Sequence, residues 1–315
     1  MSLYPWLEPA AARLRAAREA GRSPPALLIH EAPGVGAMQL AVYAAQLQFC
    51  AANPPACGRC NHCRRIAQGE HPDFIVVGPD AESKLGQITI DQVRAIAGQL
   101  ALSSYQGKGT VVVFQPAEAL NRNAANALLK TLEESRPDAS LVLVTTAPSL
   151  LPATVRSRCL KLAAAAPDRD TAIAWLAAQQ PAHKADWPAV LDVLGVAPVE
   201  ALAVDVGHIL AIRTEVLQLL DDARRGRIDV IRTAEAWAKD ELPLRLRGIE
   251  NCLTGRILAM RSGPRLQDAP LDINIGTALG LLDDLRGLQR QLATSLNKPL
   301  ALERHLWQLN RAGGA

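Results

Sequence analysis

The sequence predicts an α/β domain with a buried parallel sheet and helices on both of its faces, followed by a helical remainder. Short apolar runs alternate with amphipathic helical patterns through the first half of the chain, which is typical of βαβ units. The run AAAAPDRD at 163–170 marks a shift in composition, and the sequence after it has helical patterns without a convincing strand. At 315 residues the chain is also too long for one typical core, so we expect two or three domains.

Four apolar runs are expected to be strands, because short stretches rich in Val, Ile and Leu suit a parallel sheet that is buried on both faces. Three helical patterns lie between them. In chain order, we expect a strand at 26–29, a helix at 38–49, a strand at 74–77, a helix at 91–102, a strand at 111–114, a helix at 123–134 and a strand at 141–144.

The domain limits follow from these patterns. We expect the α/β domain at 1–165, a small helical domain at 166–204 and a second helical domain at 205–315. The second helical domain has apolar residues at helical spacing, for example Ile209 and Ile212.

Composition excludes several classes of protein. The chain is 49% hydrophobic with only 3% aromatic residues, which favours helices over β-sandwiches. A formal net charge of +3 is too mild to argue for nucleic-acid binding by itself. The sequence lacks an uncharged apolar run of about 18 residues, and its N-terminus lacks the pattern of a secretory signal. We therefore expect a soluble, cytosolic protein with no membrane partner.

Four of the six cysteines fall in the segment CAANPPACGRCNHC. The spacing C-x6-C-x2-C-x2-C lets short turns close four thiolates round one Zn²⁺, and structural disulfides are rare in the cytosol. An iron–sulfur cluster is the alternative on ligand number. Four protein ligands leave no open position, so zinc here would be structural and not catalytic. The expected ligands are Cys50, Cys57, Cys60 and Cys63.

Three nearby or similar residues are expected to have simpler roles. With four cysteines available, His62 is expected to be a loop residue and not a ligand. Cys159 and Cys252 stand alone in the sequence, and lone cysteines are most often small buried hydrophobic residues.

The segment IHEAPGVGAMQL at 29–40 lies where a phosphate-binding loop would connect a strand to a helix. A working loop reads G-x-x-x-x-G-K-[ST], because its lysine reaches the phosphate oxygens and its hydroxyl holds Mg²⁺. Here Glu31 replaces the first glycine, Ala37 the lysine and Met38 the hydroxyl residue, while Gly34 and Gly36 keep the turn. Nucleotide affinity should therefore be low, and an ordinary glycine-rich turn is the simpler interpretation of these residues alone.

The segment LNRNAANALLKTLEESRPDASLVLVTTAPSLLPATVRSRC at 120–159 resembles bacterial clamp-loader AAA+ subunits. The cysteine cluster and the N-terminal YPWL strengthen the resemblance, which is dense over residues 1–165 and thin beyond them. It implies an AAA+ domain with a zinc-binding insertion, a small helical lid at 166–204 and a helical collar at 205–315 that assembles with other subunits.

Compared with the family pattern, the nucleotide site of this chain is degenerate. A Walker B strand ends in an aspartate and a glutamate that serve Mg²⁺ and water, but here Gln115 and Pro116 follow the strand. Glu118 comes two positions too late and is expected to be a solvated acid at the start of a helix. Thr145 and Thr146, at the position of the sensor residue, are expected to be strand-end hydroxyls. The resemblance therefore implies that this chain holds no ATP of its own.

Ser157-Arg158-Cys159 is a complete copy of the family's S-R-C motif. In clamp loaders this motif supplies an arginine finger to the ATP site of a neighbouring subunit. The resemblance implies that Arg158 acts in trans, with Ser157 and Cys159 supporting it, while Arg156 is expected to be solvated.

The function implied by the resemblance is that of a non-hydrolysing subunit. It would form a ring with gamma/tau and delta subunits, which opens a sliding clamp and places it on primed DNA. One alternative is a gamma-like subunit that hydrolyses ATP itself, which the residues at 37, 38, 115 and 116 argue against. A second is an independent zinc-ribbon nucleic-acid binder, for which the cysteine segment offers only Arg59, Arg64 and Arg65 and no aromatic residue for stacking.

Overall fold

The chain divides into two compact units, Met1–Pro167 and Asp168–Ala315. The computed structural model describes residues 3–21, 24–52, 55–83, 85–101, 107–134, 136, 138–262, 273–292 and 297–313.

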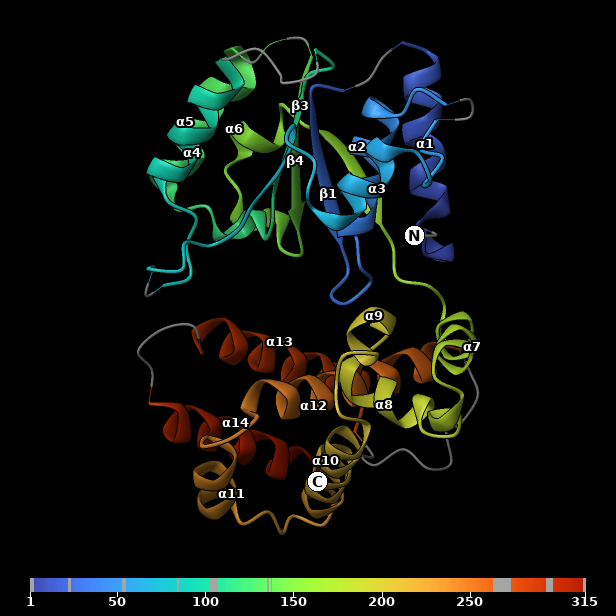
Figure 1. Cartoon of the computed structure of the whole chain (residues 1–315). Coiled ribbons are helices and arrows are strands. Elements are labelled where there is room, and N and C mark those ends of the chain that lie inside the picture. Colours follow the sequence, from blue (N-terminus) through green and yellow to red (C-terminus); the bar gives the residue numbers. More distant parts are fainter. Residues whose placement is uncertain are drawn as a thin grey trace. The chain divides into compact units, whose positions relative to one another are not determined.

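The first unit is a parallel sheet covered by helices on both faces (Figure 1). Its strands are β1 (Ala26–Glu31), β2 (Phe74–Val77), β3 (Thr110–Phe114), β4 (Ala139–Thr145) and β5 (Leu160–Ala164). Its α-helices are α1 (Glu8–Glu19), α2 (Met38–Phe49), α3 (Asn61–Gln68), α4 (Ile90–Ala101), α5 (Arg122–Glu134) and α6 (Ala153–Arg156). Short 3₁₀ helices are η1 (Pro5–Leu7), η2 (Ala117–Ala119) and η3 (Pro148–Leu150).

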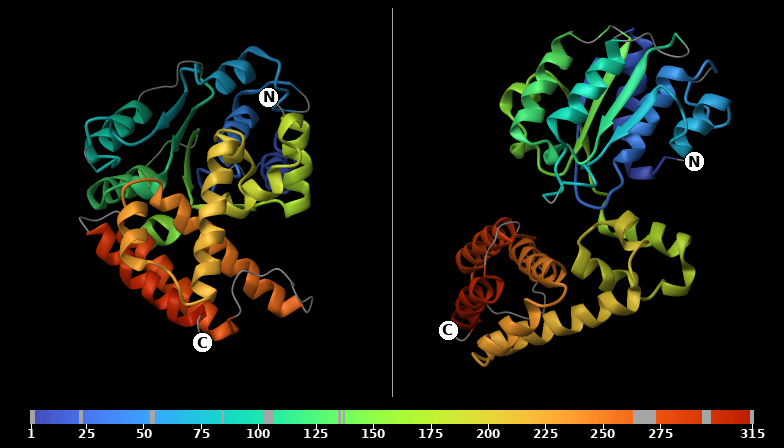
Figure 2. Two further views of the ribbon diagram at one scale, coloured as in Figure 1. Left: turned by 90° about the horizontal axis from the view of Figure 1, so that it is seen from below. Right: turned by 60° about the vertical axis from the view of Figure 1, so that its left-hand side comes forward.

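The strand order is β2-β3-β4-β1-β5, and every neighbouring pair is parallel. Side chains of a strand alternate between faces, so each strand contributes to two cores. In β1, Leu27 and Ile29 pack in the core with α1, α2 and α3, whereas Ala26 and Leu28 pack in the core with α4, α5 and α6. Figure 2 shows these two helical layers from other directions. This is the AAA+ type of α/β fold that the sequence predicts.

Strand β5 was not among the expected strands. In LKLAA only Leu162 and Ala164 are buried, and the three other side chains are exposed. The segment pairs with β1 alone, at the edge of the sheet. An edge strand with one lysine and two buried side chains does not give the continuous apolar run on which the prediction depended.

The second unit consists of helices over its described residues. They are α7 (Arg169–Gln179), η4 (Pro181–His183), α8 (Trp187–Leu194), α9 (Pro198–Ala201), α10 (Val206–Arg224), α11 (Val230–Trp237), α12 (Leu242–Ser262), α13 (Ile275–Gln291) and α14 (Lys298–Gly313). One hydrophobic core joins α7 and α8 to the helices that follow residue 204, with Trp187 fully buried in it. The further division of this unit into a lid and a collar stays a prediction.

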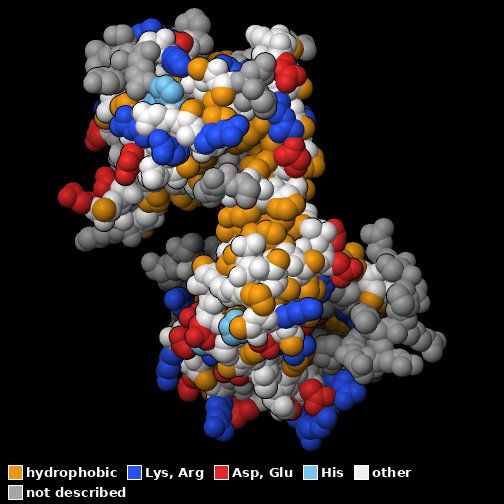
Figure 3. Space-filling model, turned by 45° about the vertical axis from the view of Figure 1, so that its right-hand side comes forward, with side chains coloured by type: hydrophobic (Ala, Val, Ile, Leu, Met, Phe, Trp, Pro, Cys, Tyr) orange, Lys and Arg blue, Asp and Glu red, His pale blue; other side chains and the backbone are white. Residues whose placement is uncertain are grey.

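Charged side chains do not gather by sign on the face drawn in Figure 3. Among the described residues, Lys and Arg are interspersed with Asp and Glu. None of the described helices is both long enough and apolar enough to cross a membrane.

Candidate metal centre, degenerate nucleotide loop and exposed arginine

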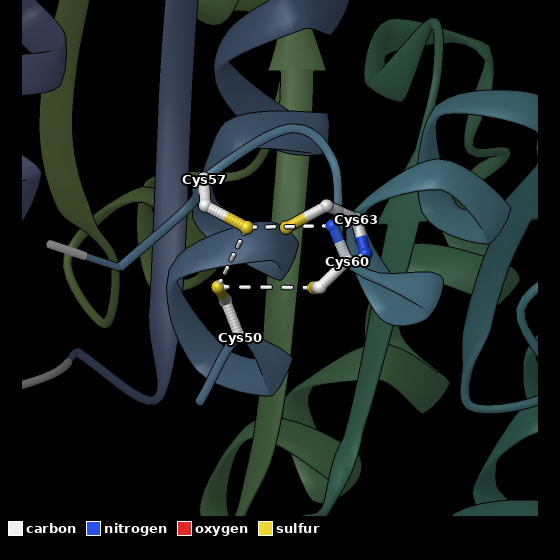
Figure 4. Close-up of side chains that lie close together, drawn as sticks. All are labelled: Cys50, Cys57, Cys60 and Cys63. Atoms are coloured by element: carbon white, nitrogen blue, oxygen red, sulfur yellow. Dashed lines mark hydrogen bonds between the residues drawn. The ribbon is translucent and has the colours of Figure 1, made fainter. Parts of the chain in front are cut away.

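The four clustered cysteines converge from two helices and the segment between them (Figure 4). Cys50 directly follows α2, Cys60 is the N-cap of α3, and Cys63 lies in the first turn of α3. The four Sγ atoms, that of Cys57 included, all lie within 4.8 Å of one another. The cluster could therefore hold a metal ion.

The spacing of the sulfur atoms fits a tetrahedral four-thiolate site. The Sγ atoms of Cys50 and Cys57 are 3.6 Å apart, and those of Cys50 and Cys60 are 3.9 Å apart. Zn–S bonds of about 2.3 Å in a tetrahedron place the sulfur atoms about 3.8 Å from one another. The chemistry of the donors and their separation thus agree with such an ion.

Backbone amides support negative charge on two of these sulfur atoms. The N–H of Cys60 donates to the Sγ of Cys57, and the N–H of Cys63 donates to the Sγ of Cys60, each at 3.4 Å. Hydrogen bonds from the amides of Arg59 and Cys60 lower the pKa of the Cys57 thiol to about 6. Burial instead raises the pKa of the Cys63 thiol, and a bound cation would favour its thiolate form.

A pair of histidines lies beside the cluster. The Nδ1 of His62 is 3.0 Å from the Nε2 of His71, and the Nδ1 of His71 accepts from the amide of Asp73 at 3.1 Å. His71 is buried, with its ring 4.5 Å from that of Phe49. The expectation that His62 is a loop residue is wrong, because it lies on α3. Its contact with His71 links α3 to the turn before β2.

The degenerate loop between β1 and α2 is filled by a side chain of the chain itself. The Glu31 carboxylate accepts a hydrogen bond of 2.9 Å from the backbone N–H of Ala37, and Glu31 is only 9% exposed. Ala37 occupies the position of the phosphate-binding lysine. Gly34 and Gly36 have φ of +72° and +78°, a region that glycine adopts without strain. The loop keeps its turn, but a carboxylate lies where backbone amides would cradle a phosphate.

The N-terminal segment also fastens this loop. The indole N–H of Trp6 donates to the carbonyl oxygen of Val35 at 2.9 Å, and the backbone N–H of Tyr4 donates to the side chain of Gln39 at 2.8 Å. Val35 is completely buried. The loop is therefore held from the chain's own N-terminal residues as well as by Glu31.

The carboxyl ends of β3 and β4 lie on the same side of the sheet as the loop, because the strands are parallel. Gln115 and Pro116, joined by a cis peptide bond, follow β3 in place of acidic residues. The expectation that Glu118 is a solvated acid at the start of a helix holds only in part, because Glu118 lies in η2 but is half-buried and hydrogen-bonded. Its Oε1 accepts from the hydroxyl of Thr146 at 2.7 Å and from the amide of Thr146 at 3.1 Å. Glu118 thus ties the end of β3 to the end of β4.

The charges of Glu31 and Glu118 act on each other. Burial raises the pKa of Glu31, and repulsion from Glu118 adds to that increase. Although burial also opposes ionisation of Glu118, hydrogen bonds led by that from Thr146 lower its pKa overall. Two carboxylates, and no lysine, therefore stand at the positions that this fold uses for nucleotide phosphates.

The Ser157-Arg158-Cys159 segment connects α6 to β5. Ser157 and Arg158 are exposed, and Arg158 keeps 40% of its side chain accessible. Cys159 is buried, which raises the pKa of its thiol to about 11 and agrees with the expected buried cysteine. Arg156 is half-buried with its Nε out of solvent, so the expectation of a solvated arginine holds only in part.

Comparisons with known proteins place the chain in a family. A family model described as DNA polymerase III, delta subunit, matches residues 6–167. DNA polymerase III subunit delta′ of Pseudomonas aeruginosa is 33% identical over 245 residues, which cover 77% of this chain and 73% of that protein. The chain belongs to the DNA polymerase III subunit delta′ family. The prediction of a clamp-loader AAA+ relative is thereby confirmed.

Other relatives match shorter segments. The delta′ subunit of Escherichia coli is 38% identical over 180 residues, or 56% of this chain and 53% of that protein. The tau subunit of the same organism is 33% identical over 143 residues, covering 45% of this chain and 22% of that protein. Among solved structures, a gamma subunit-related protein of Thermotoga maritima matches with a TM-score of 0.46 and 18% identity, covering 96% of this chain and 99% of that one.

Two features of the site in this delta′ family member could not be named from the sequence. The first is the contact between the Nη2 of Arg158 and the Oε1 of Glu133 on α5, which are 2.5 Å apart although the residues are 25 positions apart in the chain. The second is the hydrogen bond from the loop amide of Ala37 to the Glu31 carboxylate. The only sequence signal for Glu133 is its place at the end of the helix expected at 123–134, and its side chain is exposed.

Proposed function

We propose that this chain is a non-hydrolysing clamp-loader subunit that supplies Arg158 in trans to ATP held by a neighbouring gamma/tau subunit. The observation that carries the proposal is the position of Arg158 relative to the chain's own loop. Arg158 precedes the amino end of β5, whereas Glu31 is at the carboxyl end of β1 and is paired with Ala164 at the far end of β5. The two regions are thus at opposite ends of the strands, Arg158 at the amino ends and Glu31 at the carboxyl ends.

The separation is too large for an arginine side chain to span. Leu160 and Ala164 are four residues apart along β5, which at about 3.3 Å per residue is about 13 Å, and Arg158 comes two residues earlier. An exposed guanidinium at the amino ends of the strands can act only on a phosphate that another molecule brings to it. Its planar, permanently charged fork suits that role.

Several features argue against ATP hydrolysis by the chain itself. Ala37 and Met38 remove the point charge and the metal hydroxyl, and Gln115 and Pro116 remove the acidic residues that serve metal and water. Glu31 adds a buried carboxylate on the loop amide. Tight nucleotide binding by the isolated chain would favour the gamma-like alternative instead.

The partners follow from the family. Relatives of this chain include proteins named as tau and tau/gamma subunits of DNA polymerase III. We infer that the helical unit supplies a lid at 166–204 and a collar at 205–315. The collar joins gamma/tau and delta subunits in a ring that loads the sliding clamp on primed DNA, as part of the DNA polymerase III holoenzyme.

The ion of the cysteine cluster is proposed to be Zn²⁺ with a structural role. Four thiolates at tetrahedral spacing occupy every position of such an ion, so none is left for substrate or water. The ion would fasten α3 to the end of α2. The cysteine segment offers no aromatic residue for stacking, and Arg65 donates to the carbonyl oxygen of Glu70, which argues against a zinc ribbon that binds nucleic acid.

The test is steady-state ATP hydrolysis by the reconstituted clamp loader with clamp and primed DNA. With Arg158→Ala, turnover at the site that receives this arginine should fall by roughly 10³-fold or more, the range typical of arginine fingers. Arg158→Lys should recover little, because lysine keeps the charge but not the fork.

Arg94→Ala is a suitable control, since Arg94 is an exposed arginine of the same unit, with 68% of its side chain accessible. It should leave turnover unchanged. Equal assembly of all variants must be shown first by gel filtration. Full turnover in an assembled Arg158→Ala complex would exclude the finger and leave this chain as a scaffold.

A further inference from the structure

Arg158 is held by two contacts from two different elements. Its Nη2 lies 2.5 Å from the Oε1 of Glu133, near the end of α5, and its Nη1 donates to the carbonyl oxygen of Thr154 in α6 at 3.0 Å. The hydroxyl of Ser157 donates to the same carbonyl oxygen at 3.1 Å. The direction of the guanidinium is therefore fixed from both sides.

The backbone beneath the arginine is anchored as well. Val155 is completely buried, and Cys159 is 8% exposed in the core shared with α5. The thiol of Cys159 is also 3.4 Å from the carbonyl oxygen of Val155. With Val155 and Cys159 packed on either side of it, the remaining freedom of Arg158 is in its long side chain, which Glu133 contacts.

The two contacts leave most of the guanidinium available. An arginine has five N–H donors, and one on each Nη is directed at an oxygen of the chain. The remaining donors can still bind phosphate oxygens. A long, flexible side chain ordinarily loses rotamer entropy when it binds, and an arginine that is already oriented loses less.

We propose that Glu133 is a positioning residue for Arg158: it orients the guanidinium so that its free N–H donors reach the phosphate of the neighbouring subunit. This inference depends on the proposed role of Arg158 in trans. Glu133 does not touch the nucleotide, and all of its effect on turnover passes through Arg158.

Glu133 should affect turnover mainly by orienting Arg158, and only weakly through its own negative charge near the phosphate. Glu133 is 51% exposed, so its negative charge is screened by water and acts only weakly on a phosphate that lies beyond the arginine. The ion pair is also weak, because exposed pairs change an equilibrium by a factor of about five at most. The expected effect of losing Glu133 has the same upper bound.

The neighbouring acid gives a matched control. Glu134 is also exposed and at the end of α5, but it lines the groove between α4 and α5 together with Lys130. Removing either glutamate changes the charge of the same helix end by the same amount. Only the removal of Glu133 takes away an oxygen that contacts Arg158.

The experiment compares Glu133→Ala, Glu133→Gln and Glu134→Ala in the reconstituted clamp loader with clamp and primed DNA. Glu133→Ala should lower kcat for ATP by about three- to fivefold without changing KM, since ATP is held by the neighbour. Glu133→Gln keeps an acceptor oxygen and should recover part of the loss. Glu134→Ala should match wild type.

The decisive arm is the double variant. Glu133→Ala combined with Arg158→Ala should turn over at the rate of Arg158→Ala alone, because a positioning residue has no effect once its partner is gone. A further loss in the double variant, or unchanged or higher turnover in Glu133→Ala, would overturn the role of Glu133. Unchanged turnover in Arg158→Ala would instead refute the proposed finger, so the two failures are distinct.

Discussion

Helix α2 has a polar site at each end, and the two sites are satisfied in different ways. At the N-terminal end, the Glu31 carboxylate accepts the hydrogen bond of the Ala37 amide, so the loop already has its anion. At the C-terminal end, Cys50 opens a cluster of sulfur atoms whose separations match the ligands of one ion. The first site already has an anion from within the chain, whereas the donors of the second converge on a shared centre that could hold an ion.

The largest expected effect is at the C-terminal end of α2. Cys60→Ser, or extraction of the metal with a strong chelator, should remove the bound ion and destabilise the first unit. An ion present at 1,000 times its Kd stabilises a fold by about 4 kcal/mol, and this is the expected loss. Metal content and thermal unfolding of the purified chain measure the two effects.

Cys252→Ser is the control for this prediction. Cys252 lies on α12 in the second unit, outside the cluster. The variant should keep about one zinc per chain, as wild type does. A wild-type chain that carries iron would contradict the assignment of zinc, and one that carries no metal at all would also remove the difference between the two ends of α2.

The N-terminal end should respond to a substitution with a smaller effect. Glu31→Ala leaves the N–H of Ala37, a completely buried residue, without its acceptor, and such a loss costs about 1–3 kcal/mol. Glu31→Gln keeps an acceptor oxygen and removes the repulsion from Glu118, so it should cost less than Glu31→Ala. Urea unfolding of both variants tests the difference. Equal stability of all three proteins would mean that Glu31 does not close the loop.

The same comparison separates what the sequence could predict from what it could not. The runs VVVF and LVLV give their strands directly, because β3 and β4 are central strands of the parallel sheet and are buried on both faces. Spacing along the chain was enough to group Cys50 with Cys63, since these ligands are close in sequence. The edge strand β5 was missed because its burial depends on a neighbour, β1, that sequence does not reveal.

Partners of the remaining site residues depend on long-range geometry. Glu118 and Thr146 are 28 positions apart and meet only because β3 and β4 are paired. Glu133 and Arg158 meet because α5 and α6 pack on the same face of the sheet. Motif spacing identified Arg158 but had no means of finding the carboxylate beside it.

The smallest expected effect is a dependence of stability on pH that separates Glu31 from Glu118. Burial raises the pKa of Glu31 above its ordinary value, so the folded chain holds this proton more tightly than the unfolded chain does. The contribution of Glu31 is then fully present below its unfolded pKa and is lost as pH rises through its folded pKa. Glu118 has a lowered pKa, so its contribution is present above the unfolded value and is lost as pH falls through the folded one.

The two windows lie on opposite sides of the ordinary pKa of glutamate, which lets one variant isolate Glu31. As pH rises above about 4, the ordinary pKa of glutamate, the free energy of unfolding of wild type should fall relative to that of Glu31→Gln until pH passes the folded pKa. Each unit by which the pKa is raised contributes about 1.4 kcal/mol to this fall. Taking the difference between the two proteins cancels the titration of the cysteine cluster, which they share. A difference that stays constant as pH rises would mean that burial does not raise the pKa of Glu31 in the folded chain.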